Sequence, residues 1–100
     1  EEYTVALLRP NGPDYGLVED YCSVAGVQYN KYTTVLKEVK ESLPKGIIMM
    51  PMDDCDVFKI TAESPEDVTR TISELEKAVI SVINKHGKRR IEELNLEKVF

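Results

Sequence analysis

Every methionine of the chain and one of its two cysteines fall within the stretch "MMPMDDCD", residues 49–56. Thioether and thiolate sulfur are soft ligands that suit Cu(I), whereas the neighbouring aspartate carboxylates are hard ligands that suit Mg²⁺, Ca²⁺ or Mn²⁺. A mixed set without histidine matches none of these ions well, so we expect a methionine-rich strand and an acidic turn, with no metal or other cofactor. The residues that would ligate an ion in the alternative case are Met50, Met52, Asp54, Cys55 and Asp56.

A second cluster of reactive side chains is "NKHGKRR", residues 84–90, which carries four cations and the only histidine of the chain. Arginine and lysine bind phosphate, but cations at the end of a helix also complement its dipole. The net charge of −5 argues against general binding to nucleic acid, and no aromatic residue interleaves to stack on bases. We expect the structural role and retain phosphate or RNA contact as the alternative. The residues that would make that contact are Lys85, Lys88, Arg89 and Arg90.

Signals of a catalytic centre are weak. The chain has no GxSxG, no HExxH and no glycine-rich phosphate loop. Cys22 and His86 could pair as nucleophile and base, but any cysteine and any histidine offer that pairing. Cys22 and Cys55 match neither a zinc-ligand spacing nor CxxC, and whether they form a disulfide stays open. We therefore expect a protein that is not an enzyme.

The composition is that of a single globular domain covering residues 1–100. Apolar residues make up 42% and charged residues 31% of the chain, a balance typical of folded proteins. No run approaches the ~20 apolar residues of a membrane span, and "EEYTVALL" lacks the positive flank of a signal peptide. We expect a cytoplasmic protein with reduced thiols and no membrane contact.

The elements that position these residues follow from breakers and periodicity. Residues 3–8 are β-branched, aromatic and apolar, which predicts a strand. Residues 9–29 begin with proline and glycine breakers and then give no regular signal, so a short strand, a helical turn or a lid is expected there. Residues 31–43 carry one apolar stripe at helical spacing, with Asn30 as the N-cap and Gly46 shortly after the end.

The second half has clearer signals. Residues 46–52 and 55–63 predict the two strands of a hairpin, and Pro51, which lacks an N–H, places the first of them at the edge of a sheet. Ser64 then predicts the N-cap of a long helix with a regular apolar stripe. Gly87 is expected to end that helix in the left-handed conformation.

The order of elements predicts an α+β fold. We expect a two-layer sandwich in which two helices cover a mainly antiparallel sheet, in the split βαβ or ferredoxin-like manner. The order is β-α-β-β-α, and a final β stays open because residues 96–100 alternate as a strand would, whereas residues 91–94 fit one more helical turn.

The second helix is about 33 Å long, so its far end overhangs the sheet or packs on something else. That overhang could pair with a helix of a second copy. A methionine on an edge strand adds an adaptable partner surface. The residues expected to contact a partner are Met49, Val82 and Ile83.

The run "ESLP", a hairpin and then "FKITAESPEDVTRTISELEKAVISVI" resemble the small dimerising subunit of the KEOPS complex, which modifies tRNA. The resemblance covers residues 33–83 and implies the same β-α-β-β-α order and a homodimeric, non-catalytic scaffold. Residues 9–29 and the basic tail after Gly87 depart from that family's pattern, and no functional residue is carried over. The leading hypothesis is a protein-interaction domain, either a homodimer or a complex subunit. The alternatives are a small-molecule or metal-binding sensor and an RNA-associated protein.

Overall fold

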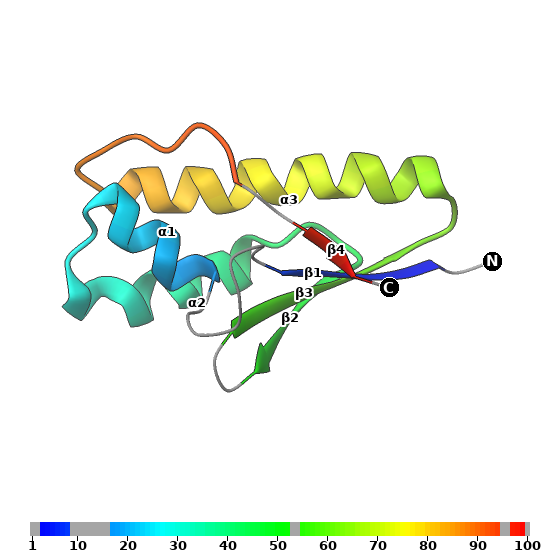
Figure 1. Cartoon of the computed structure of the whole chain (residues 1–100), viewed down its shortest axis with the longest axis horizontal. Coiled ribbons are helices and arrows are strands. Elements are labelled where there is room, and N and C mark those ends of the chain that lie inside the picture. Colours follow the sequence, from blue (N-terminus) through cyan, green and yellow to red (C-terminus); the bar gives the residue numbers. More distant parts are fainter. Residues whose placement is uncertain (1–2, 9–16, 53–54, 95–96, 100) are drawn as a thin grey trace.

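The computed structural model describes residues 3–8, 17–52, 55–94 and 97–99, with side chains for 18–49 and 58–94 (Figure 1). Within these described residues four strands form one sheet in the order β2-β3-β1-β4, and each neighbouring pair is antiparallel. The predicted α+β class is confirmed, and of the two alternatives left open at the C-terminal end the structure has a strand, at residues 97–99. The strands are β1 (Tyr3–Leu8), β2 (Ile47–Met52), β3 (Cys55–Ala62) and β4 (Glu97–Val99).

Strands β2 and β3 form the predicted hairpin, and β2 lies at the edge of the sheet. The Thr61 N–H donates to the Gly46 carbonyl at 2.9 Å, so backbone bonds between the two strands recur at every second residue along them. Pro51 falls between these bonding positions and directs its nitrogen away from β3, where a missing N–H costs nothing. On β3, Phe58 and Ile60 are fully buried whereas Thr61 is exposed, as the alternation predicts.

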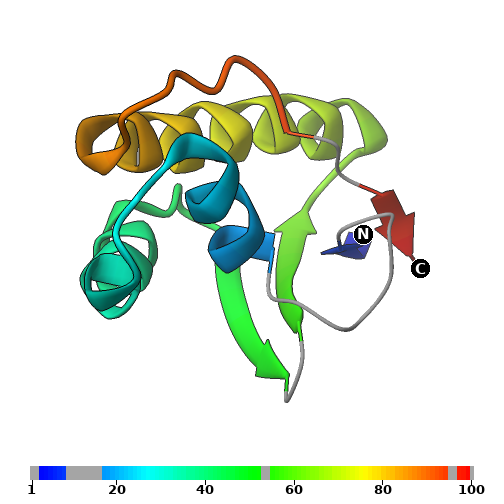
Figure 2. The same ribbon diagram turned by 60° about the vertical axis from the view of Figure 1, so that its left-hand side comes forward.

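Within the described residues the chain forms three α-helices, one more than the sequence predicts. They gather on one side of the sheet, and α1 and α2 lie beneath the C-terminal half of the longest helix, α3 (Figures 1 and 2). The additional helix occupies part of residues 9–29, where no regular pattern of apolar residues was found. The helices are α1 (Leu17–Ala25), α2 (Tyr32–Ser42) and α3 (Pro65–His86), and a 3-10 turn, η1 (Tyr29–Lys31), precedes α2.

The buried residues form one cluster shared by the sheet and the three helices. Helix α3 contributes its predicted stripe, and the part that extends beyond the sheet packs on α1 and α2. Its length is therefore accounted for within the chain, without a partner. Among the residues whose side chains are described, ten apolar ones are at most 1% exposed; the largest are Phe58, Ile60, Leu75 and Ile83. Among the described helices, none combines the length and apolar character required to cross a membrane.

The two predicted N-caps have different outcomes. Ser64 accepts a hydrogen bond from the Asp67 N–H at 3.2 Å, with Pro65 at the first helical position, as predicted. The prediction that Asn30 caps α2 is wrong: the N-cap is Lys31, and its side chain makes no capping bond. Asn30 lies inside η1, so the chain is already turning before α2 begins and the capping position moves one residue on.

The segment after α3 is neither a helical turn nor a strand up to Leu94. We name residues 88–94 the strap, because they run back along α3 (Figure 1). The Asn84 side chain pairs with both backbone groups of Ile91: its amide donates to the Ile91 carbonyl and its oxygen accepts from the Ile91 N–H, each at 2.8 Å. Ile91 and Leu94 are buried at 6% and 7% exposure, so the strap closes the core over α3.

Gly87 does not adopt the predicted left-handed conformation. Its φ is −84°, which any residue can adopt. Glycine is required there for a different reason: a Cβ would lie 2.8 Å from the Ala25 Cβ and 2.9 Å from the Ala25 carbonyl oxygen. The left-handed glycine at a helix end is Gly26, with a φ of 75° after α1.

Candidate functional site

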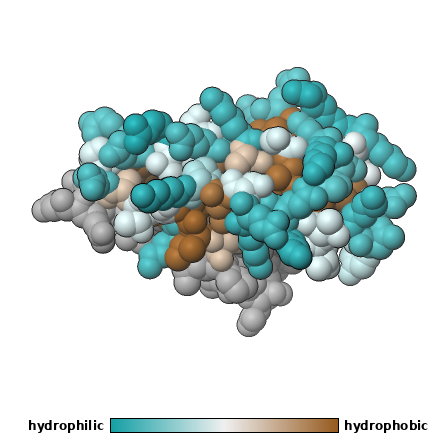
Figure 3. Space-filling view, turned by 180° about the vertical axis from the view of Figure 1, so that it is seen from behind, coloured by the Kyte–Doolittle hydropathy of each residue, from teal (hydrophilic) through white to brown (hydrophobic). Residues whose placement is uncertain are grey.

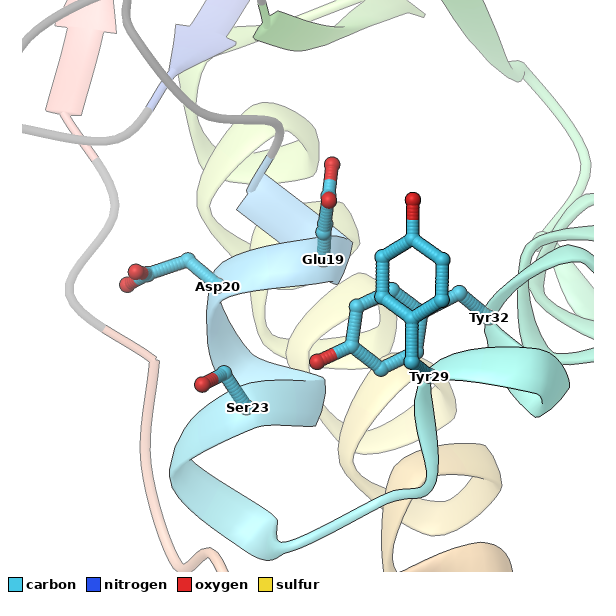
Figure 4. A pocket seen from close by; sticks show the side chains of 5 residues that line it. All are labelled: Glu19, Asp20, Ser23, Tyr29 and Tyr32. Carbon is cyan, nitrogen blue, oxygen red and sulfur yellow. The ribbon is translucent and has the colours of Figure 1, made fainter.

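The main candidate site is a hollow of about 330 Å³ where α1 faces η1 and the start of α2. Three of its residues come from α1 and the two tyrosines come from η1 and α2 (Figure 4). The hollow therefore depends on how α1 is seated, which is the part of the fold that the sequence did not predict. The lining residues are Glu19, Asp20, Ser23, Tyr29 and Tyr32.

The seating of α1 follows from its apolar spacing. Val18, Cys22 and Ala25 lie on one helical face and have no exposed surface. The opposite ridge must then face outward, and Glu19 and Ser23, which are one turn apart, are both exposed on it. The polar side chains of the hollow are thus placed by the burial of their neighbours.

The end of α1 is fixed by a complete Schellman motif. The Gly26 N–H donates to the Ser23 carbonyl at 3.1 Å, and the Val27 N–H donates to the Cys22 carbonyl at 2.9 Å. Gly26 supplies the left-handed residue that this motif needs, and Val27 is buried at 5% exposure beside the helix. These two hydrogen bonds and the burial of Val27 therefore fix the path of the chain from the end of α1 toward η1.

The strap adds a second cap to the same helix end. The N–H groups of Lys88 and Arg89 both donate to the Ala25 carbonyl at 2.8 Å. The Arg89 side chain donates from Nε to the Val24 carbonyl at 2.9 Å and from Nη2 to the Ser23 carbonyl at 3.4 Å. A cation at the negative end of a helix dipole is favourable, so Arg89 holds α1 in place from a position distant in the sequence.

The two tyrosine rings form the other wall of the hollow. Their centroids are 5.2 Å apart and their planes are tilted by 49°, an arrangement in the favourable range for aromatic pairs. Tyr32 is half-buried against the core, but Tyr29 is 80% exposed. Figure 4 shows Glu19 extending from α1 on the side of the rings, and Asp20 and Ser23 extending on the other side in that view.

The chemistry available in the hollow is recognition of positive charge. Aromatic ring faces and carboxylates both attract cations, and the Ser23 hydroxyl and the tyrosine hydroxyls can each accept a hydrogen bond. Among the described residues, Glu19 forms no salt bridge, whereas Asp20 already has an interaction within the chain.

The basic segment does not act as one patch. Lys85 lies 3.3 Å from Glu38, and Arg89 is bonded to the end of α1. Lys88 and Arg90 are exposed. Of the four phosphate or RNA candidates, two thus have partners inside the chain, but not in the expected way: Lys85 pairs with Glu38 of α2, and Arg89 caps the end of α1 rather than complementing the dipole of α3.

His86 belongs to an ion cluster at the end of α3. Its Nε2 lies 2.9 Å from Glu38 Oε1, and Lys85 Nζ lies 3.3 Å from Glu38 Oε2. The hydrogen bond from His86 is the largest cause that lowers the pKa of Glu38; burial opposes it, and the hydrogen bond and charge of Lys85 together with the charge of His86 lower the pKa further. The cluster joins α2 to α3, so His86 is bonded to Glu38, whereas Cys22, the nucleophile considered above, is fully buried.

The sulfur and acid candidates fall outside the residues whose side chains the structure describes. The side chains of Met50, Met52, Cys55 and Asp56 and the whole of Asp54 lie outside the described residues. Met49 packs, half-buried, against the core from the face that it shares with Phe58. Among the residues whose side chains are described, no three of His, Cys, Asp and Glu converge to hold a metal ion.

Two residues expected to meet a partner are buried inside the chain. Val82 is 7% exposed and Ile83 is fully buried. Because α1 packs on α3, the far end of α3 is covered and these two residues offer a partner no surface as the chain is folded.

Sequence reasoning missed all five lining residues of the hollow. A signal was present: Val18, Cys22 and Ala25 recur at helical spacing, acids stand in the first turn, and Gly26 follows. Only nine residues carry that pattern, which is too short a stretch to outweigh the breakers before it.

Comparison with known proteins gives no relative for this chain: no family model, no curated protein and no solved structure matches it.

Proposed function

We propose that the chain is a non-enzymatic, protein-binding domain that contacts its partner through one corner. We name this surface the α1–η1 corner, and it consists of Glu19, Asp20, Ser23, Val24, Tyr29 and Tyr32. The observation that carries the proposal is the hollow of about 330 Å³, walled by a tyrosine pair and a polar ridge.

The distribution of exposed apolar side chains supports this choice of surface. Among the described residues the large apolar side chains that are exposed are Val24 at 56%, Tyr29 at 80% and Ile48 at 56%. Two of these belong to the α1–η1 corner, and exposed aromatic residues are enriched at protein interfaces. From behind, the surface is mostly hydrophilic, with apolar side chains in small groups (Figure 3).

The outer face of α3 supports the proposal by contrast. Apart from Pro65 in its first turn, its exposed positions carry polar or charged side chains, so it offers a partner little apolar surface. The exposed polar and charged positions are Glu66, Thr69, Arg70, Ser73, Glu74, Lys77, Ser81 and Lys85.

We also propose that the fold is a variant of the split βαβ, or ferredoxin-like, arrangement. The strand order β2-β3-β1-β4 with antiparallel neighbours supports it, as does the β2–β3 hairpin between the two helical connections. In this interpretation α1 and η1 are insertions in the connection between β1 and β2. The α1–η1 corner is formed by these insertions and is not part of the basic βαββαβ fold.

The resemblance to the dimerising KEOPS subunit remains a proposal about assembly. It favours a homodimer, whereas the corner fits a complex with another protein equally well. Pairing through Val82 and Ile83 is not part of the proposal, because both are buried.

Affinity purification of the full chain from its source cells tests the proposal. We compare the wild type with Val24→Ser/Tyr29→Ala, which removes both exposed apolar side chains of the α1–η1 corner. The matched control is Ser73→Ala/Lys77→Ala on the outer face of α3, where both side chains are exposed. Thermal unfolding of each variant verifies that it is folded, and light scattering at high micromolar concentration reports self-association.

The expected result is one stoichiometric partner, or a second copy, that binds the wild type and the control and is lost from the corner variant. An identical set of bound proteins for all three chains would contradict the proposal. A strict monomer without any stoichiometric partner would contradict it as well.

A further inference from the structure

We propose that the hollow at the α1–η1 corner receives the guanidinium group of an arginine side chain presented by the partner. This inference rests on the proposed function and adds the chemistry of the contact. It is carried by the tyrosine pair with its exposed ring, by the Glu19 carboxylate that lines the same hollow, and by the volume of that hollow.

The first step concerns charge. Glu19 is exposed on the rim and, within the described residues, forms no salt bridge. The Tyr29 ring is 80% exposed, so its negative face is accessible to a ligand. A carboxylate beside an accessible ring favours a cation over an anion or a neutral group, and the net charge of −5 favours a cationic partner at longer range.

The second step concerns shape. A guanidinium is planar, stacks on an aromatic ring and presents a fork of N–H donors that matches a carboxylate, whereas an ammonium is a compact, strongly hydrated charge. The ring pair, tilted by 49°, leaves Tyr29 free to stack while Glu19 accepts from the fork. A hollow of about 330 Å³ is ample for the end of one such side chain.

The third step concerns the charges already present at the corner. Asp20 has an interaction within the chain, so recognition rests on Glu19. Among the arginines in the described part of the chain, Arg89 is bonded to the Val24 and Ser23 carbonyls at the end of α1. Its guanidinium caps the helix and does not line the hollow.

The test is an NMR titration of the ¹⁵N-labelled full chain with the peptide acetyl-Gly-Arg-Gly-amide. The matched probes replace arginine with lysine or with citrulline, which keeps the shape and removes the charge. We expect saturable amide shifts confined to residues 19–32, an affinity about tenfold weaker for citrulline and a smaller loss for lysine. Glu19→Gln and Tyr29→Ala should each weaken the arginine peptide, whereas Tyr29→Phe, which keeps the ring, and Glu66→Gln, an exposed acid on α3, should not.

No saturable shift with the arginine peptide, equal binding of citrulline, or shifts centred outside the corner would overturn the inference. The two proposals fail in different ways. If Glu19→Gln keeps the protein partner while Val24→Ser/Tyr29→Ala loses it, the corner is an interface that does not recognise arginine. If both keep the partner, the proposed function itself is wrong.

Discussion

The ends of α1 and α3 lie against each other, and each is followed by a glycine that serves a different purpose. Gly26 is needed by its own backbone, since its φ of 75° disfavours any side chain. Gly87 has an ordinary φ of −84° and is needed by a neighbour, since a Cβ would lie 2.8 Å from the Ala25 Cβ. One glycine satisfies a local rule of helix termination, and the other is set by tertiary contact.

The tertiary contact at Gly87 also supports the helix end that Gly26 terminates. The close approach at Gly87 brings the strap to the end of α1, where the N–H groups of Lys88 and Arg89 reach the Ala25 carbonyl at 2.8 Å. A bulkier residue at either glycine therefore disturbs the same junction between α1 and the strap. At Gly26 the cause is backbone strain and at Gly87 it is steric overlap with Ala25, so substitutions can separate the two causes.

Gly87→Ala is expected to have the largest effect. A new Cβ at 2.8 Å from Ala25 forces α1 and α3 apart, and overpacking of this kind costs about 2–3 kcal/mol of unfolding free energy. Urea unfolding of the wild type and the variant measures the loss. The matched double variant Ala25→Gly/Gly87→Ala removes the contact with the Ala25 Cβ but leaves the Ala25 carbonyl oxygen at 2.9 Å, so it should recover only part of the stability beyond the sum of the single changes. Additive losses would show that the contact does not limit this position.

Asn84→Ala is expected to rank second, and it tests whether the strap depends on α3 rather than on α1. The substitution leaves both backbone groups of the buried Ile91 without their partner, which costs about 2 kcal/mol. Hydrogen exchange should show faster exchange of the Ile91 amide, with α2 less affected. Ser81→Ala, on the exposed side of the same helix, is the control and should change neither quantity. An unchanged Ile91 amide in Asn84→Ala would contradict the assigned role.

The two glycines also show where sequence reasoning succeeds. The hairpin, the Ser64 cap and the apolar stripe of α3 were predicted because alternation, capping and helical spacing are local and repeat over many residues. Gly87 was assigned a local role, although its constraint comes from Ala25, which no local pattern connects to it. The hollow was missed for the same reason, since it exists only after a nine-residue helix is seated.

Gly26→Ala is expected to lower the free energy of unfolding by about 1 kcal/mol, less than Gly87→Ala. It strains the backbone, but it does not bring the new Cβ as close to neighbouring atoms. A Cβ at Gly26 would lie 3.4 Å from the Arg89 guanidinium, which is an ordinary contact distance. Gly26→Asn is the matched control, because asparagine tolerates the left-handed conformation and should be destabilised less. Thermal unfolding midpoints rank the three chains. Equal losses for alanine and asparagine would mean that backbone strain is not the controlling term.

Arg89→Ala should lower the unfolding free energy by somewhat under 1 kcal/mol, because the cap that it removes is exposed. Arg90→Ala removes an exposed neighbour of the same charge and should leave stability unchanged. The pair also separates structure from nucleic-acid binding. If Arg90→Ala and Arg89→Ala lower stability equally, the capping role of Arg89 is wrong. If RNA binding were the role of the segment, both variants would weaken a tRNA gel shift at low salt without such a difference in stability.

The smallest effect is expected from Glu38→Gln, and it depends on pH. The hydrogen bonds from His86 and Lys85 lower the pKa of Glu38 in the folded chain below its unfolded value. A group of this kind stabilises the fold above the unfolded pKa, and the contribution is lost as the pH falls through the folded pKa. The wild type should therefore unfold at a slightly higher temperature than Glu38→Gln near pH 7, and the difference should shrink to nothing in strong acid. Glu41→Gln, an exposed acid on the same helix, should match the wild type throughout. A gap between wild type and Glu38→Gln that persisted in strong acid would assign the effect to packing at the end of α3, because no charge on Glu38 would remain to account for it.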